Sequence, residues 1–281
     1  MSGAPPDSPR RLVLLGHPVA HSLSPRMHAA ALAAIGSTLR YDAIDVTPEA
    51  LEARLDALVR ESAAGNVTIP HKMSVAVRCT ELTERARRAG AVNVFWVRSG
   101  ALIGDNTDIP AFDRLTALTL GSRPAGERIA LLGAGGAAAA VLAAAEQWRD
   151  CHVILFNRSR APAELLAARF GVVERIAETA DDAVHGATLV VNATALGLED
   201  GDPLPIAVER IPSGAAVVDL VYRPRGTAWV QAATAHGLRA NDGLEMLLEQ
   251  GALAFERWLG VPAPRAVMRD ALVRHAGGQG A

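Results

Sequence analysis

The stretch from Glu127 to Leu142 constrains the fold of this chain most strongly. Residues 129–132 form a short apolar run of strand type, Gly133-Ala-Gly-Gly136 then turns the chain, and small residues from 137 to 147 predict a helix. A strand, a glycine turn and a helix in this order form a phosphate-binding unit, because glycine lets the backbone approach a pyrophosphate and the helix N-terminus offers free N–H groups. The spacing Gly-x-Gly-Gly-x-Ala departs from the usual Gly-x-Gly-x-x-Gly, so the motif alone also fits a tight turn without a ligand.

Strand-like and helix-like segments alternate through the same half of the chain. The strand candidates are residues 128–132, 152–156, 172–175, 188–192, 215–220 and 238–240. Segments of helical pattern separate most of them, at residues 162–170, 179–185 and 227–236. This alternation predicts an α/β fold with a doubly wound, Rossmann-type parallel sheet.

The residues after the second of these strands bear on the choice of cofactor. In a dinucleotide-binding sheet, an acidic residue at this place binds the ribose hydroxyls of NAD, whereas arginine accommodates the 2′-phosphate of NADP. Here the segment is Asn157-Arg158-Ser159-Arg160 and contains no carboxylate, which favours NADP, although a solvated turn could have the same composition. Asn192-Ala-Thr194 follows the fourth strand and is expected over the cofactor.

Polar residues also follow predicted strands in the first half of the chain. Asn66, Thr68 and Lys72 are expected at the carboxyl end of a strand that begins at Gly65, where open α/β sheets bind ligands. Strands at residues 91–97 and 101–105, joined by Arg98-Ser-Gly100, predict a hairpin.

Two hydroxyls precede the first predicted helix. Ser22 and Ser24 lie in a loop at its start, where hydroxyls and free N–H groups suit a carboxylate. The alternative is that Ser24, which precedes Pro25, is only the N-cap of that helix.

Lys72 is the only lysine in the chain. A coding bias toward arginine would explain this, and a lysine should then survive where arginine cannot replace it. Arginine stays protonated at any ordinary pH, whereas lysine can give and take a proton in a suitable environment. A chemical role for Lys72 and a compositional accident both remain open on this observation.

Two further helices are expected, from Lys72 to Arg88 and from Asn241 to Gly260. Gln250 lies off the apolar stripe of the second, a place where polar side chains are usually solvated.

The composition excludes several classes of function. The chain has 281 residues, half of them apolar, which is comfortable for two domains. The formal net charge of −2 gives no support for binding nucleic acid or an anionic membrane. Cys79 and Cys151 stand alone and the histidines lack ligand spacing, so no metal is expected. We find no signal peptide or membrane span and expect a cytoplasmic protein.

Taken together, these motifs resemble the shikimate dehydrogenase family, in a collinear match from Gly16 to Gly260. The stretches that carry the resemblance are 16–25 (Gly-His-Pro-Val-Ala-His-Ser-Leu-Ser-Pro), 66–72 (Asn-Val-Thr-Ile-Pro-His-Lys), 90–93 (Gly-Ala-Val-Asn), 104–108 (Gly-Asp-Asn-Thr-Asp), 133–138 (Gly-Ala-Gly-Gly-Ala-Ala), 157–159 (Asn-Arg-Ser), 192–194 (Asn-Ala-Thr), 219–222 (Asp-Leu-Val-Tyr) and 250–252 (Gln-Gly-Ala). Each stretch is weak evidence, but the ordered set is specific.

The resemblance implies an activity and a division into domains. The activity is the reversible NADPH-dependent reduction of 3-dehydroshikimate to shikimate, in chorismate and aromatic amino acid biosynthesis. Residues 11–109 would form the substrate-binding domain and residues 110–241 the NADP-binding domain. Residues 242–281 would form C-terminal helices that pack on the substrate domain. The partners implied are small molecules, with the chain a monomer or a homodimer.

The resemblance also implies roles for individual residues. Lys72 and Asp108 would be the catalytic pair, since a positioned lysine can move the hydroxyl proton and a carboxylate can orient it. The substrate would contact Ser22, Ser24, Asn66, Thr68, Asn93, Tyr222 and Gln250. The cofactor would contact Gly133, Ala134, Gly135, Gly136, Ala137, Asn157, Arg158, Ser159, Arg160, Thr194, Leu220 and Gly243.

Three departures from the family pattern keep alternatives open. Ile109-Pro-Ala-Phe112 replaces the usual glycines after Asp108, Pro162 replaces a basic residue, and Ala29 stands where asparagine is frequent. One alternative is a relative that acts on quinate or another hydroxylated ring carboxylate. The other is a non-catalytic NADP-responsive binding protein.

Overall fold

The computed structural model describes residues 9–223 and 225–276, which form two compact units. The first unit contains the chain up to Asp108 and from Leu247 onward, and the second runs from Ile109 to Met246. The domain boundaries predicted from the sequence fall after residues 109 and 241, whereas the two units divide after Asp108 and after Met246. Residues 277–281 of the predicted C-terminal segment lie outside the described residues.

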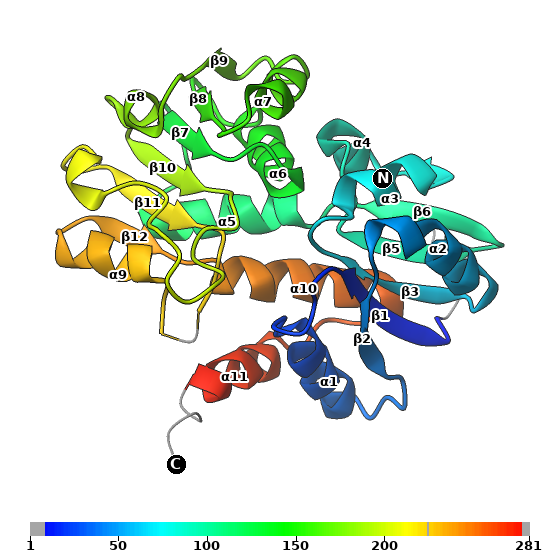
Figure 1. The fold of residues 1–281 in the computed structure, drawn as a ribbon. Helices are drawn as coiled ribbons and strands as arrows, with labels where there is room; N and C mark the ends of the chain where they lie inside the picture. Colours follow the sequence, from blue (N-terminus) through cyan, green and yellow to red (C-terminus); the bar gives the residue numbers. More distant parts are fainter. Residues whose placement is uncertain (1–8, 224, 277–281) are drawn as a thin grey trace. The chain divides into compact units, whose positions relative to one another are not determined.

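The second unit contains a parallel sheet with the strand order β12-β11-β10-β7-β8-β9 (Figure 1). Its strands are β7 (Arg128–Leu132), β8 (His152–Phe156), β9 (Val173–Ile176), β10 (Leu189–Asn192), β11 (Ala216–Asp219) and β12 (Arg239–Asn241). Counted from β7 this is the 3-2-1-4-5-6 order of dinucleotide-binding sheets, which reverses between β7 and β10. The predicted Rossmann-type α/β fold is therefore confirmed.

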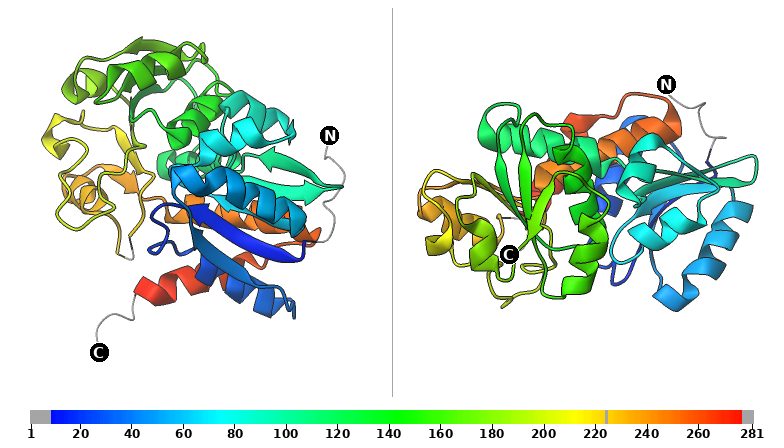
Figure 2. Two further views of the ribbon diagram at one scale, coloured as in Figure 1. Left: turned by 45° about the vertical axis from the view of Figure 1, so that its right-hand side comes forward. Right: turned by 90° about the horizontal axis from the view of Figure 1, so that it is seen from above.

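Helices lie on both faces of this sheet (Figure 2). They are α5 (Asp108–Leu120), α6 (Gly136–Ala145), α7 (Arg160–Ala167), α8 (Ala180–Val184) and α9 (Ala228–Ala235), with a 3-10 turn at Val208–Arg210. Helix α6 packs against β8, and its residues from Ala138 to Ala145 are all buried. Small side chains suit this place because they let a helix lie close to the sheet. Helices α8 and α9 share a core with β7, β10 and β11, which includes the fully buried Trp229.

The first unit contains a mixed sheet with the strand order β2-β1-β3-β5-β6-β4. Its strands are β1 (Arg11–Gly16), β2 (Tyr41–Asp45), β3 (Ala63–Val67), β4 (Glu81–Leu82), β5 (Val94–Arg98) and β6 (Ala101–Asp105). The predicted hairpin is present, since β5 and β6 are antiparallel and Arg98 pairs with Ala101. Strands β1, β2 and β3 are parallel, so polar residues after β1 and β3 emerge at the same edge.

The helices of the first unit come from both ends of the chain. They are α1 (Ser24–Ala34), α2 (Leu51–Arg60), α3 (Lys72–Arg78), α4 (Glu84–Ala89), α10 (Leu244–Leu259) and α11 (Arg265–Ala276), with a 3-10 turn at Pro48–Ala50. Helices α10 and α5 cross the boundary between the units along the chain. Helix α2 buries Leu51, Leu55 and Leu58, and α11 packs along α1.

Two local predictions are wrong. The helix expected from Lys72 to Arg88 is interrupted, because β4 pairs in parallel with β6 and the Thr83 hydroxyl then accepts the Ala86 N–H to begin α4. Ser24 is not an N-cap: it is the first residue of α1, and the Ser22 hydroxyl accepts the Ser24 N–H at 3.2 Å. The hydroxyl of Ser24 is therefore not used to cap the helix.

Gly65 in β3 generates a prediction about the sheet that positions the site. A Cβ atom there would lie inside van der Waals contact of the Val13 carbonyl oxygen and 2.8 Å from Val13 Cγ2. Since the backbone of a central strand cannot move away, we expect Gly65→Ala to lower the free energy of unfolding by about 3 kcal/mol. Gly171→Ala is the control, because that glycine is exposed and its Cβ would meet nothing within 4 Å. Equal urea-unfolding midpoints for the two variants would contradict this expectation.

Candidate active site

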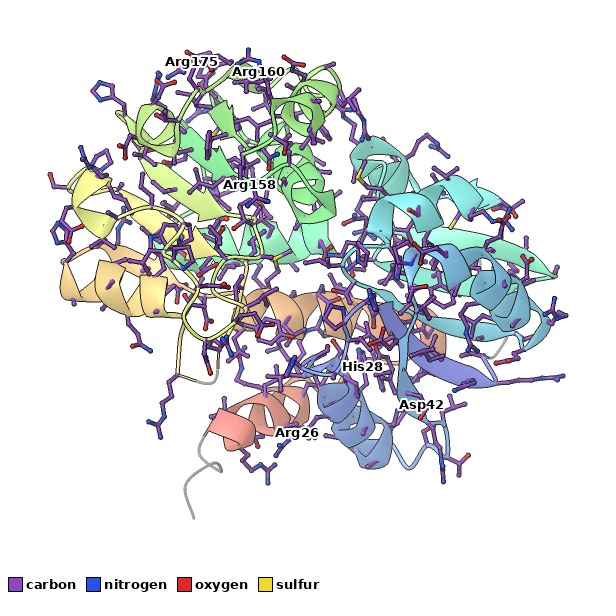
Figure 3. All side chains as sticks on the ribbon, in the orientation of Figure 1. Arg26, His28, Asp42, Arg158, Arg160 and Arg175 are labelled. Carbon is purple, nitrogen blue, oxygen red and sulfur yellow. The ribbon has the colours of Figure 1, made fainter. Side chains whose placement is uncertain are left out.

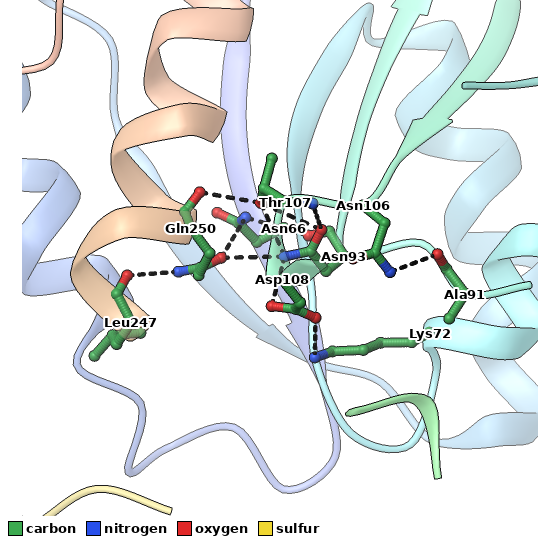
Figure 4. Close-up of polar contacts among 9 residues, drawn as sticks. All are labelled: Asn66, Lys72, Ala91, Asn93, Asn106, Thr107, Asp108, Leu247 and Gln250. Carbon is green, nitrogen blue, oxygen red and sulfur yellow. Dashed lines mark hydrogen bonds and ion pairs between the residues drawn. The ribbon is translucent and has the colours of Figure 1, made fainter. Parts of the chain in front are cut away.

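Lys72 and Asp108 form an ion pair in the first unit (Figure 4). Lys72 Nζ lies 2.7 Å from Asp108 Oδ2, and the two side chains are only 15% and 5% exposed. Each is the first residue of its helix, α3 for Lys72 and α5 for Asp108. A carboxylate is favoured at the N-terminus of a helix, where the backbone dipoles leave a partial positive charge. The pair is thus held at a polar edge of the sheet with little access to water.

Asn93 holds the second oxygen of this carboxylate. Its Nδ2 donates to Asp108 Oδ1 at 2.8 Å, while its Oδ1 accepts the Thr107 N–H at 2.7 Å. Because a backbone N–H can only donate, this contact fixes which end of the Asn93 amide faces Asp108. Asp108 therefore accepts from a cation at one oxygen and from an amide at the other, which is the pattern of an ionised carboxylate.

Two more amides extend this group of polar side chains. Gln250 Oε1 lies 3.3 Å from Asn93 Nδ2 and 3.4 Å from Asn66 Nδ2, both long hydrogen bonds. Gln250 Nε2 donates to the Leu247 carbonyl at 2.8 Å, which fixes the direction of its amide. Gln250 is only 8% exposed, so the expectation of a solvated side chain from the helical pattern is wrong.

The serine loop lies beside the segment that leads to Lys72. The His17 N–H donates to the Ile69 carbonyl at 2.9 Å, and a Cβ added at Gly16 would collide with the methyl group of Thr68. The loops after β1 and β3 therefore meet at the same edge of the sheet. Ser24 is buried, whereas Ser22 and Thr68 are partly exposed.

The glycine turn of the second unit has the geometry that its sequence predicts. Gly133 has a φ of +113°, and a Cβ there would lie 2.8 Å from the Ala193 carbonyl group. Only glycine allows the turn to pack on the Ala193–Thr194 peptide in this way. The turn leads into α6, which begins at Gly136 and offers the free amides of its first turn. These residues fit the pyrophosphate of a dinucleotide, although α6 alone would not specify one.

The two arginines of the predicted 2′-phosphate site have different surroundings (Figure 3). Arg160 Nε lies 2.8 Å from Glu164, and the same guanidinium is paired with Glu178. Arg158 is exposed and makes neither a hydrogen bond nor an ion pair with any residue that the structure describes. Asn157 Nδ2 donates to the Ser159 carbonyl at 2.7 Å and shapes the turn between the arginines.

Asp219 at the end of β11 organises the remaining predicted cofactor contacts; it lies in the stretch 219–222 that carries the family resemblance, but no role was predicted for it. Its Oδ1 accepts from Asn192 Nδ2 at 2.8 Å and from the Val221 N–H at 3.0 Å, and its Oδ2 accepts from the Thr227 hydroxyl at 2.7 Å. Asn192 Oδ1 in turn accepts from both the N–H and the hydroxyl of Thr194. The sequence signal that could have pointed to Asp219 is a carboxylate at the end of an otherwise apolar strand.

The same edge carries Leu220, Tyr222 and Gly243. A Cβ at Gly243 would collide with the Leu220 carbonyl oxygen, and the Gly243 N–H donates to the Val221 carbonyl at 3.0 Å. Glycine is required at this close approach of two backbones. Tyr222 is partly exposed.

Within the described residues, no three histidine, cysteine, aspartate or glutamate side chains gather in a way that could hold a metal ion. No helix in the described part of the chain is long and apolar enough to cross a membrane.

The buried Asp219 carboxyl leads to a prediction about pH. Burial raises its pKa from 3.8 to about 6, although its hydrogen bonds oppose this shift. The folded state then binds the proton more tightly than the unfolded state, so the contribution of this group to stability falls as pH rises from about 4 to 6. Across this range we expect the unfolding free energy of the wild type, relative to Asp219→Asn, to fall by about 3 kcal/mol. Urea unfolding of both proteins at pH 4 and pH 7 measures this, and parallel pH profiles would contradict it.

Comparison with known proteins identifies the family. The family model described as the shikimate dehydrogenase substrate binding domain matches residues 14–95, and that of the shikimate 5′-dehydrogenase C-terminal domain matches residues 243–273. The NADP(+) shikimate dehydrogenase of Symbiobacterium thermophilum is 43% identical in a match that covers 96% of this chain and 96% of the relative.

Solved structures agree with this result. The chain is 41% identical to shikimate 5-dehydrogenase from Thermus thermophilus, solved in complex with NADP(H) and shikimate, with a TM-score of 0.82 and coverage of 95% of this chain and 99% of that chain. Quinate dehydrogenase from Corynebacterium glutamicum, in complex with NAD, is 27% identical with a TM-score of 0.84 and covers 95% and 100% of the two chains. Because the shikimate dehydrogenases of Symbiobacterium thermophilum and Thermus thermophilus are 43% and 41% identical to this chain over nearly its whole length, the chain belongs to the shikimate dehydrogenase family.

Proposed function

We propose that this chain catalyses the reversible NADPH-dependent reduction of 3-dehydroshikimate to shikimate, a step in the biosynthesis of chorismate and aromatic amino acids. The observation that carries the proposal is the largely buried ion pair between Lys72, the only lysine, and Asp108. Relatives with this activity in their names support it. The pair also argues against a non-catalytic NADP-responsive binding protein, because binding alone requires no proton-transfer group.

The chemistry assigns a task to each member of the pair. Reduction of a ketone adds a hydride to the carbonyl carbon and a proton to the carbonyl oxygen. NADPH, when bound, supplies the hydride. The Lys72 ammonium donates the proton to the oxygen, and the neutral amine takes it back in the reverse direction. Asp108 holds Nζ in position and stabilises its charged form, while Asn93 prevents the carboxylate from turning away.

The substrate residues follow from the resemblance and from the polar edge of the first unit. Ser22 and Ser24 bind the ring carboxylate, and a Ser24 hydroxyl that does not cap α1 is consistent with that role. Asn66, Thr68, Asn93 and Gln250 bind the ring hydroxyls, and Tyr222 also contacts the substrate. The first unit is thus the substrate domain.

The second unit is the NADP domain in this proposal. Gly133 to Ala137 accept the pyrophosphate, Asn157 to Arg160 surround the 2′-phosphate, and Thr194, Leu220 and Gly243 lie near the nicotinamide. Gly133 at the close approach and the unpaired Arg158 support this assignment. The protein acts in the cytoplasm as a monomer or a homodimer.

The main alternative substrate is quinate, and the structural similarity to quinate dehydrogenase supports this alternative. Shikimate and quinate are both ring carboxylates with neighbouring hydroxyls, so the same polar groups could bind either. Comparing kcat/KM for shikimate and quinate with NADP and NAD, in all four pairs, tests the proposal. A preference for quinate would replace the proposed substrate.

Lys72→Arg tests the proton-transfer role. Arginine keeps the positive charge and the hydrogen bonds to Asp108 but cannot deprotonate near neutral pH. We expect kcat to fall by about 10²–10⁴, as it should for Lys72→Ala, with NADP binding by titration nearly unchanged. Asp108→Asn should also lower kcat, and the double variant should lose less than the sum of the singles. A Lys72→Arg enzyme with a normal kcat and pH profile would exclude proton transfer by this residue.

Arg158→Ala tests the cofactor assignment, with Arg160→Ala as its matched control. A guanidinium–phosphate contact contributes about 1.5–3 kcal/mol, so KM for NADPH should rise tenfold or more in Arg158→Ala while KM for NADH changes little. Because Arg160 is already paired with Glu164 and Glu178, its loss should have a smaller effect. Equal losses with the two cofactors would rule out Arg158 as the phosphate ligand.

A further inference from the structure

Tyr41 connects the outer edge of the first sheet to the proposed substrate site. It is the first residue of β2 and is 6% exposed, and its hydroxyl donates to Asn66 Oδ1 in β3 at 2.7 Å. Strand β1 lies between β2 and β3, with Leu12 paired to Tyr41 and Leu14 paired to Asn66. The tyrosine side chain therefore reaches across a whole strand to contact this asparagine.

The surrounding atoms fix the direction of the Asn66 amide. Its Nδ2 donates to the Asn93 carbonyl at 3.2 Å, and a carbonyl oxygen can only accept. The amide oxygen must then face Tyr41, whose hydroxyl must donate. Asn66 is 3% exposed, so loss of this donor would remove a hydrogen bond from a buried amide oxygen.

The tyrosine ring is itself held in place. The imidazole of His28, a fully buried residue of α1, stacks on it with ring centroids 4.3 Å apart and an interplanar angle of 18°. Burial lowers the pKa of His28 to about 3, so this ring is neutral at physiological pH. Trp258 of α10 packs at 6.2 Å from the tyrosine ring and 5.3 Å from the imidazole. Tyr41 thus has little freedom to move its hydroxyl away from Asn66.

We propose that Tyr41 is a positioning residue of the substrate site, which acts through Asn66 by holding the side-chain amide of that residue, and with it the amides of the site that it contacts, in one fixed direction. This inference rests on the proposed function, in which Asn66 contacts a ring hydroxyl. The hydroxyl of Tyr41 contacts Asn66, which is not one of the two catalytic groups. Its effect should therefore fall on use of the ring substrate and leave use of the cofactor unchanged.

Tyr41→Phe removes only the hydroxyl and keeps the ring on His28. We expect kcat/KM for shikimate to fall by about three- to tenfold, the size for loss of one neutral hydrogen bond, and KM for NADP to stay within about twofold. Thr119→Val is the control, because it also removes a buried hydroxyl, which accepts from Asn241 in the second unit. That variant should lose thermal stability but retain its kcat/KM for shikimate.

A double-variant cycle with Asn66→Ala separates positioning from general loosening of the fold. If Tyr41 acts through Asn66, the effect of Tyr41→Phe on the logarithm of kcat/KM should be less than half as large in the Asn66→Ala background as in the wild-type background. A loss of half or more there, or wild-type kinetics for Tyr41→Phe alone, would overturn the proposal. Wild-type enzyme inactive with shikimate would instead refute the proposed function.

The side-chain amide resonances of Asn66 in ¹⁵N-labelled protein give a readout that does not depend on activity. Tyr41→Phe should shift them and speed their exchange with water, whereas Thr119→Val should not. Unchanged resonances in Tyr41→Phe would overturn the proposal whatever the reaction of the enzyme.

Discussion

The carboxylate of Asp108 is the group on which the polar edge of the first unit depends. A buried carboxylate without partners costs several kcal/mol, so its neighbours must supply both charge and hydrogen bonds. Lys72, Asn93 and the N-terminus of α5 do this together. Asn93 can do so only because the Thr107 N–H fixes its amide, and the same amide nitrogen sets the place of Gln250. The proposed proton-transfer group, Lys72, is thereby oriented by one carboxylate and a chain of neutral amides.

The sequence predicted the strands and turns that carry these groups better than it predicted their contacts. Apolar runs and glycines located every strand of the second sheet within one residue, because hydrophobic period and turn chemistry are local properties. Gln250 and Asn66 meet across 184 residues, and Tyr41 reaches Asn66 over an intervening strand. The helical pattern placed Gln250 on a solvated face, since a single helix does not reveal what covers it. The family resemblance implied that Gln250 lies in the substrate site, but no sequence pattern pointed to Tyr41.

The arginines after β8 show the same limit at the surface. Arg158 and Arg160 stand in one motif, and the four residues of that motif give no reason to separate them. Glu164 lies one helical turn after Arg160, which the spacing could have indicated. Glu178 lies beyond β9 and reaches Arg160 only through the fold. The structure therefore leaves one arginine paired and the other available for an anionic ligand, a distinction that depends on residues outside the motif.

Asp108 and Asp219 show how partners decide what a buried carboxylate can do. Both follow or end a strand, and both are less than 5% exposed. Asp108 faces a lysine, so its negative charge is matched at the place where we propose that a proton moves. The hydrogen bonds that Asp219 accepts come from neutral donors, namely an amide, a hydroxyl and a backbone N–H, and burial raises its pKa. A carboxylate with neutral partners is suited to tying loops together, because it accepts several hydrogen bonds at once. The cation beside Asp108 is what distinguishes this carboxylate from Asp219, and the proposed catalytic role rests on it.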